Sequence, residues 1–271
     1  MNWLNRSSLA SFKTSILLGF MALNFLLTGI DVLIAHSQNN FFRWELIPLI
    51  FSPLAVLAVL AQLVFQHNIV VKRTFQTTMW VGVAVGLVGT LLHIAGNATS
   101  NQVSLNRLLV TGSPIAAPIA FAGISCYALA SAHYSGTTRR SKLLVFVGLG
   151  FLGAVIAAFL DHARLGFVSS YTLIPLVSGT LATLICFHMA YGHANPHKTE
   201  TYTCFSILIL NLLVGLLGLG FHLAGNLAGT QSIVWARMMY RNPLLGPLLF
   251  SNLALLGGLS LLPEPEAKLR D

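Results

Sequence analysis

Apolar stretches of about twenty residues recur along the whole chain, and short polar segments separate them. A helix needs about twenty apolar residues to cross the hydrocarbon core of a bilayer. Eight stretches meet this requirement: 15–35, 46–66, 77–97, 114–133, 142–162, 171–192, 203–226 and 243–262. No long polar linker interrupts them. The pattern predicts an all-α integral membrane protein with eight transmembrane helices in a single membrane domain, 1–271.

The composition supports a chain that faces lipid. Of its 271 residues, 55% are hydrophobic and only 8% are charged, whereas about a quarter of the residues in a soluble domain are charged. The formal net charge is +8. Nucleic-acid binding needs basic residues clustered on one water-facing surface, but here they are scattered between apolar runs. We therefore expect the lipid bilayer, and no nucleic acid, as a partner.

The distribution of Lys and Arg predicts the topology. One set of connections and ends carries ten basic residues: Arg6, Lys13, Lys72, Arg73, Arg139, Arg140, Lys142, Lys198, Lys268 and Arg270. The opposite connections carry five: Arg43, Arg107, Arg164, Arg237 and Arg241. Basic residues accumulate on the cytoplasmic side. We therefore expect a multi-pass protein of a bacterial-type inner membrane with both termini in the cytoplasm. The first apolar run is too long for the core of a cleaved signal peptide, so we expect it to be the first membrane helix.

An internal repeat organises the chain. Residues 85–121 match 214–250 at twelve of 37 positions when shifted by 129 residues without a gap. The shared residues include His93 with His222, Asn97 with Asn226, Gln102 with Gln231, Pro114 with Pro243 and Pro118 with Pro247. Such self-similarity indicates repeated structural units. We read these prolines as structural residues at helix starts.

The first quarter matches the third less closely. His36 meets His162 at a shift of 126, and 46–49 meets 173–176 at a shift of 127. The chain thus reads as two tandem four-helix units, 1–135 and 136–271. Units with an even number of helices insert in the same orientation, so we expect a pseudo-twofold axis along the membrane normal, unlike the inverted repeats of many transporters.

Four histidines end the odd-numbered helices on the predicted outer side: His36, His93, His162 and His222. Each unit has two of them at equivalent positions. Ionisable residues at membrane depth usually face the bundle interior. The four are therefore candidate ligands of a metal, with hydrogen-bonded or interfacial histidines as the alternative.

Small residues form a stripe on the helices that carry His93 and His222. Gly89 and Asn97 lie one turn either side of His93, and Gly218 and Asn226 have the same relation to His222. One interpretation is close helix packing with an Asn at the helix end. The other is a groove that admits a flat ring beside a His nitrogen, with His36, His93, His162, His222, Asn97, Asn226, Gly89 and Gly218 around b-type haem, or less readily copper.

This layout resembles that of haem A synthase, which also has a duplicated four-helix plan with paired outer histidines. The resemblance concerns layout alone. The histidines here lie on odd-numbered helices, and that family's loop cysteines and Glu-containing His motif are not found in the sequence.

Other polar residues are weaker candidates for a functional site. Asp31 and Asp161 could orient a neighbouring His, or lie at the interface. His67 and His193 end two helices on the cytoplasmic side and could form a second site. One Arg in each outer loop (Arg43, Arg107, Arg164 and Arg237) could hold an anionic group, although lipid anchoring explains them as well. Cys126, Cys186 and Cys204 fit buried small hydrophobic residues.

Three functions remain open at this point. The first is a membrane redox or haem-binding subunit that transfers electrons, with quinone or other membrane subunits as partners. The second is a structural or assembly subunit of a larger membrane complex, and the third is a small-solute transporter. No Walker loop, GxSxG, HExxH or dinucleotide motif occurs in the sequence, so enzymatic activity of its own stays an open question.

Overall fold

The computed structural model describes residues 6–37, 41–99, 104–193, 196–229, 232–240 and 242–263. Over these residues every regular element is helical and no strand occurs, which confirms the all-α prediction. Three basic residues used to predict the topology, Arg241, Lys268 and Arg270, lie outside the described residues.

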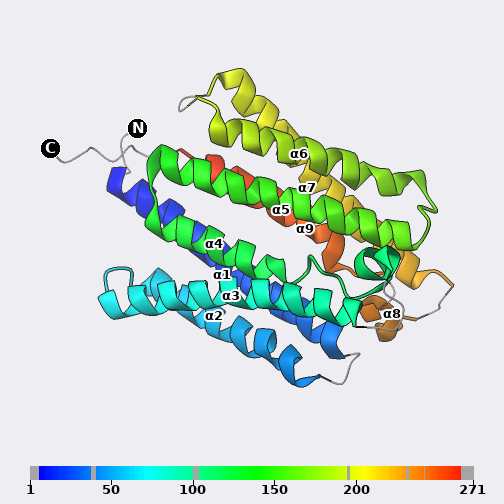
Figure 1. Ribbon diagram of the computed structural model, residues 1–271. Helices are drawn as coiled ribbons and strands as arrows, with labels where there is room; N and C mark the ends of the chain where they lie inside the picture. The colour runs from blue at the N-terminus through cyan, green and yellow to red at the C-terminus, as the bar shows by residue number, and fades with distance from the viewer. Residues whose placement is uncertain are drawn as a thin grey trace. The chain divides into compact units, whose positions relative to one another are not determined.

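Eight apolar helices follow the predicted stretches (Figure 1). They are α1 (Arg6–Ser37), α2 (Leu46–Val64), α3 (Ile69–Ala98), α4 (Ile119–His133), α5 (Gly136–Arg164), α6 (Ile174–Tyr191), α7 (Lys198–Leu227) and α9 (Leu245–Leu261). Six are long and apolar enough to cross a membrane, whereas α4 and α9 are apolar but shorter. The chain therefore has the character of a multi-pass membrane protein, with lipid against its apolar helices.

The helix predicted over 114–133 begins five residues late, at Ile119. Pro118 occupies the N-cap position, and the stretch from Pro114 to Pro118 forms a turn in which the backbone N–H of Ala117 donates to the carbonyl of Pro114 (3.3 Å). Proline has no N–H and disfavours helical conformation in the preceding residue. The two prolines thus delay the helix rather than merely kinking it. In α9, Pro247 lies within the first turn, where proline costs little.

Short helical segments lie in the connections α1–α2, α3–α4, α5–α6 and α7–α9. They are η1 (Arg43–Glu45), η2 (Arg107–Thr111), η3 (Ser170–Leu173) and α8 (Trp235–Tyr240). In η1 the Glu45 carboxylate accepts a hydrogen bond from the Phe42 backbone N–H (2.9 Å). Each segment is short enough to form a turn of helix within its connection.

Contacts between residues divide the chain into two compact units. Unit 1 comprises Met1–Phe146 and Leu259–Asp271, and unit 2 comprises Val147–Gly258. Within unit 1, α1 contacts α2 and α4, and α3 contacts the same two helices. Helices α1 and α3 are therefore diagonal partners in a four-helix arrangement. Its core is aromatic, because Phe51 lies edge-on to both Phe25 and Phe121, with ring centroids 6.0 and 5.7 Å apart.

Unit 1 buries two basic residues at the end where α1 begins. The Lys13 ammonium donates to the carbonyls of Ser260 (3.1 Å) and Leu262 (2.7 Å), which would otherwise be unsatisfied at the end of α9. Arg139 donates to the Thr14 hydroxyl (2.6 Å) and to a backbone carbonyl of α4. Both side chains are only 3% exposed, so these two cations belong to the internal packing of the unit.

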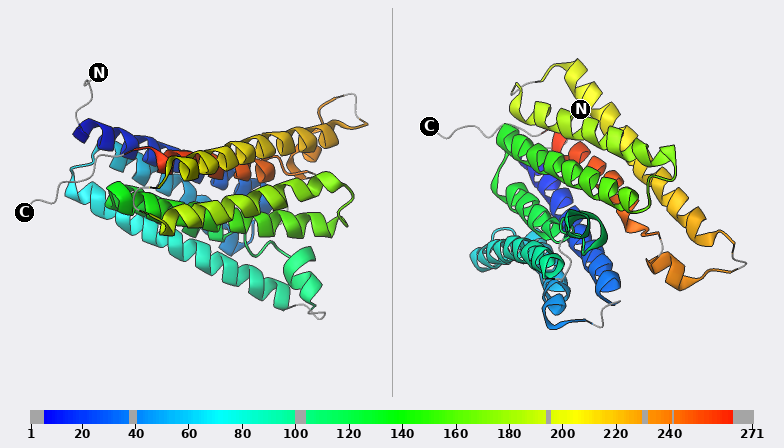
Figure 2. Two further views of the ribbon diagram at one scale, coloured as in Figure 1. Left: turned by 90° about the horizontal axis from the view of Figure 1, so that it is seen from above. Right: turned by 45° about the vertical axis from the view of Figure 1, so that its right-hand side comes forward.

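Unit 2 contains the rest of α5, α6, α7, α8 and most of α9. Figure 2 shows the α6–α7 hairpin in yellow-green and yellow. Asn211 of α7, fully buried, donates to the Ser178 carbonyl of α6 (3.0 Å), and Ser251 of α9 donates to the Leu212 carbonyl of α7 (2.8 Å). Polar bonds of this kind join helices where a bilayer offers no other partner.

Candidate histidine site

His36 and His93 come together in unit 1. They lie at the ends of the diagonal helices α1 and α3, and their ring centroids are 6.5 Å apart with an interplanar angle of 62°. Both side chains are half-buried. The Nδ1 atom of His36 is buried and has no hydrogen-bond partner among the described residues. The structure thus brings together two imidazoles that the sequence separates by 57 positions.

A backbone carbonyl fixes the orientation of His93. Its Nδ1 lies 2.9 Å from the carbonyl oxygen of Pro114. A carbonyl oxygen can only accept, so Nδ1 carries the proton and donates it. In the neutral ring the lone pair is then on Nε2. This is the arrangement that orients metal-binding histidines, in which one nitrogen donates to a carbonyl and the other is left to ligate.

Unit 2 repeats this contact. Nδ1 of His222 lies 2.8 Å from the carbonyl oxygen of Pro243, again 21 residues further along the chain. His162 of α5 lies within electrostatic range of His222, and so does the Asp161 carboxylate. Asp161 is exposed whereas His162 is half-buried, as expected for neighbours on different faces of a helix. In unit 2, His162 and His222 thus influence each other electrostatically, and the Asp161 carboxylate acts on both.

Asn97 and Asn226 organise the segments that supply these carbonyls. Asn97 is 3% exposed. Its amide donates to the Ser113 carbonyl (2.9 Å) and its oxygen accepts from the Ser113 N–H (2.8 Å). Asn226 makes the same two bonds with Asn242, at 3.0 and 3.2 Å. Ser113 and Asn242 directly precede Pro114 and Pro243, so each asparagine holds the segment whose carbonyl orients a histidine.

The glycine stripes face neighbouring helices. A Cβ atom added to Gly89 would lie 2.8 Å from Cβ of Pro118, and one added to Gly218 would lie 2.8 Å from Cβ of Pro247. The glycine face of α3 is therefore covered by the start of α4, and that of α7 by the start of α9. At these two positions the absence of a side chain allows close helix approach.

Several other candidate residues have local roles. Arg43 stacks over the Trp44 ring at 5.6 Å, and Arg237 donates to the Ala228 carbonyl (2.9 Å). Arg107 is exposed, and Arg164 lies within electrostatic range of Asp161. Asp31 and His67 are exposed. All three cysteines are free thiols, with Cys186 and Cys204 buried and Cys126 half-buried.

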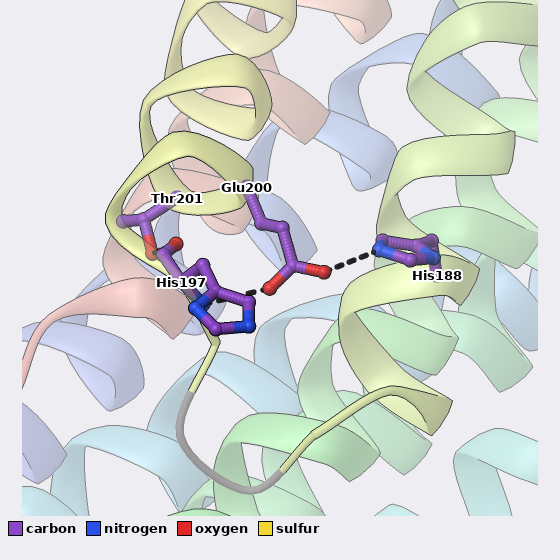
Figure 3. A network of polar contacts seen from close by, with 4 residues as sticks. All are labelled: His188, His197, Glu200 and Thr201. Carbon is purple, nitrogen blue, oxygen red and sulfur yellow. Dashed lines mark hydrogen bonds and ion pairs between the residues drawn. The ribbon is translucent and has the colours of Figure 1, made fainter.

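A second polar cluster lies in the α6–α7 connection, and Figure 3 shows it. Glu200 accepts from His188 Nε2 (3.0 Å) and from the His197 backbone N–H (2.7 Å), which caps the start of α7. The rings of His193 and His197 lie 6.1 Å apart. His193 thus has another histidine as its neighbour. An exposed pair such as His188–Glu200 contributes little stability, and its role here is to join α6 to α7.

Two features of the site were missed in the sequence. The backbone carbonyls of Pro114 and Pro243 accept hydrogen bonds from His93 and His222, although these prolines were interpreted only as structural residues. The signal in the sequence was the equal spacing of 21 residues between each histidine and its proline. The His188–Glu200 pair had no such signal, because it has no counterpart in the other unit.

Among the described residues no group of three or more His, Cys, Asp or Glu side chains could hold a metal ion. The chain matches no protein-family model, no curated protein and no solved structure.

Proposed function

We propose that the chain is an eight-span protein of a bacterial-type inner membrane, built from two tandem four-helix units, 1–135 and 136–271, with both termini in the cytoplasm. Support for the duplication comes from contacts that recur 129 positions apart: His93–Pro114 with His222–Pro243, and Gly89–Pro118 with Gly218–Pro247. Support for the orientation comes from the excess of Lys and Arg at the end opposite the histidines.

The proposed function is that of a redox subunit that holds one b-type haem at each histidine pair. The observation that carries it is the Nδ1–H of His93 and of His222 held by a proline carbonyl, which leaves Nε2 free to ligate. His36 and His93 would be the protein ligands in unit 1, and His162 and His222 those in unit 2. When bound, haem would supply a one-electron carrier between membrane quinone and an acceptor at the outer surface.

The ring separation fits two imidazoles that share one metal. The ring centroids of His36 and His93 are 6.5 Å apart, so both imidazoles could bind one metal through metal–nitrogen bonds of about 2.0 Å each. Zinc sites take three or four protein ligands, which the described residues do not provide. His36 and His93 would hold haem as its two protein ligands, and a bare copper ion would need more ligands than this pair supplies.

Visible spectroscopy of the full chain, purified in detergent from haem-replete cells, tests this proposal. We expect a b-type band on reduction with dithionite. His93→Ala should remove the contribution of unit 1, His222→Ala that of unit 2, and the double variant both. His67→Ala, in the exposed α2–α3 turn, is the control and should leave the spectrum unchanged. A colourless wild-type protein with no bound iron would overturn the haem assignment.

A second candidate is a structural or assembly subunit of a larger membrane complex. The covered glycine faces and the satisfied Asn97 and Asn226 favour it, since both features build rigid helix contacts without any ligand. A spectrally silent chain that co-purifies with other membrane subunits in fixed stoichiometry would establish this function in place of the first.

A further inference from the structure

A cavity of about 750 Å³ opens at the end of unit 1 opposite His36 and His93. It lies where α2 ends, α3 begins, α4 ends and α5 begins, and Figure 1 shows the last three of these ends together. The lining combines three cations, Lys72, Arg73 and Lys142, with a wall of large apolar side chains. Every lining residue belongs to unit 1.

No carboxylate of the described residues lines the cavity beside the three cations. The acidic residues that the structure describes are Asp31, Glu45, Asp161 and Glu200, and none of them lines this cavity. Lys72, Arg73 and Lys142 are exposed, and no ion pair with any of them occurs in the described parts of the chain. Lys13 and Arg139 differ, because they are buried and bonded inside the unit. Among the described residues, then, these three cations share the cavity with no acidic side chain, and such a cluster attracts an anion.

The apolar wall sets the character of that anion. Phe75, Trp80, Leu129 and Phe146 line the same cavity, and Trp80 is 63% exposed. Tryptophan with its face open in this way is typical of the boundary between lipid chains and head groups. A free phosphate would use only the cations, whereas an amphiphile with an anionic head would cover both the cations and the aromatic wall.

Gln62 adds a polar contact deeper in the cavity. Its side chain is 7% exposed and lines the cavity. The Oε1 atom is buried and has no donor among the described residues. A buried acceptor that lacks a partner carries a desolvation cost. The hydroxyl group of a glycerol head group can donate to it.

We propose that this cavity is a binding site for an acidic phospholipid of the phosphatidylglycerol type. Lys72, Arg73 and Lys142 hold the phosphate, Arg73 being able to make two parallel hydrogen bonds to it. The acyl chains run along Trp80 and Phe146. Basic pockets between transmembrane helices on the cytoplasmic side recognise lipid head groups in this way.

Native mass spectrometry of the full chain, released from detergent with equal amounts of phosphatidylglycerol and phosphatidylcholine, tests the proposal. We expect retained phosphatidylglycerol on the wild-type protein and a decrease of about fivefold for each cation removed, as for basic residues near an anionic bilayer surface. The test variant is Lys72→Gln/Arg73→Gln/Lys142→Gln. The matched control, Arg43→Gln/Arg107→Gln/Lys198→Gln, removes the same charge elsewhere and should retain the lipid.

Two further arms separate the possible outcomes. Trp80→Ala keeps every charge and should still weaken retention, because it removes part of the apolar wall. Millimolar inorganic phosphate should not displace the lipid; displacement, or equal retention of both lipids by the wild type, would overturn the proposal. The visible spectrum tests the histidine pair, at the end of unit 1 opposite the cavity. Failure of the lipid proposal would leave the spectrum unchanged, and a colourless protein could still retain the lipid, so the two proposals fail independently.

Discussion

Gly86→Ala is expected to destabilise the contact between α3 and α4 although alanine is the better helix former. A Cβ atom at position 86 would lie 2.6 Å from the Ala122 backbone nitrogen and 3.0 Å from the Pro118 carbonyl oxygen. Backbone atoms cannot rotate away, so the two helices must separate. Overpacking of this kind costs about 1–3 kcal/mol, which thermal unfolding in detergent measures as a lower melting temperature.

Gly96→Ala is the matched control on the same helix. Nothing lies within 4 Å of a Cβ atom at position 96, so this substitution should be neutral or stabilise the helix by about 0.5–1 kcal/mol. Gly215→Ala should behave like Gly86→Ala, because Ser251 N and Pro247 O lie 2.7 and 2.8 Å from its added Cβ, and Gly220→Ala is its open control. Equal melting temperatures for Gly86→Ala and Gly96→Ala would contradict close packing at the α3–α4 contact.

Asn97→Ala should have a second large effect, on the segment that leads into α4. The substitution leaves the N–H and the carbonyl of Ser113 without their partner, and the Asn97 amide also donates to the Leu108 carbonyl (3.2 Å). Because these bonds are only partly buried, each contributes about 0.5–1.5 kcal/mol. Hydrogen exchange of residues 107–114 should accelerate well before that of α3 itself.

Asn97→Asp distinguishes the hydrogen bonds that Asn97 donates from the one that it accepts. It keeps the oxygen that accepts from the Ser113 N–H but loses both donated bonds, so an intermediate effect is expected. Asn68→Ala, which removes an exposed cap at the start of α3, should leave exchange in 107–114 unchanged. Unaltered exchange in Asn97→Ala would show that Asn97 does not hold this segment.

Much of the architecture could be predicted from hydrophobic length, because crossing a bilayer imposes a minimum apolar run on each helix. The helices α3 and α7 extend to 30 residues each, beyond the predicted 77–97 and 203–226, since polar ends continue a helix that an apolar window does not register. The start of α4 was predicted wrongly, at residue 114 instead of Ile119. Two prolines four residues apart act together and keep the intervening residues out of the helix.

The sequence proposes residues for the candidate site but does not predict how their side chains are arranged. The repeat identified His93 and His222 as equivalent, yet the acceptor for each Nδ1 lies in a separate segment of chain that periodicity does not place. The glycine stripe had two interpretations in the sequence, and the contacts of Gly89 and Gly218 agree with close helix approach. Periodicity shows which face carries small residues, while only coordinates show what covers that face.

The late start of α4 has a consequence for the surrounding lipid. Its 15 residues span about 22 Å at a rise of 1.5 Å each, whereas the hydrocarbon core is about 30 Å thick. Irregular backbone at that depth must be shielded from acyl chains or met by water. In the eight-span arrangement proposed above, the bilayer would thin beside Pro114 and Pro118, so the protein should partition into thin bilayers in preference to thick ones.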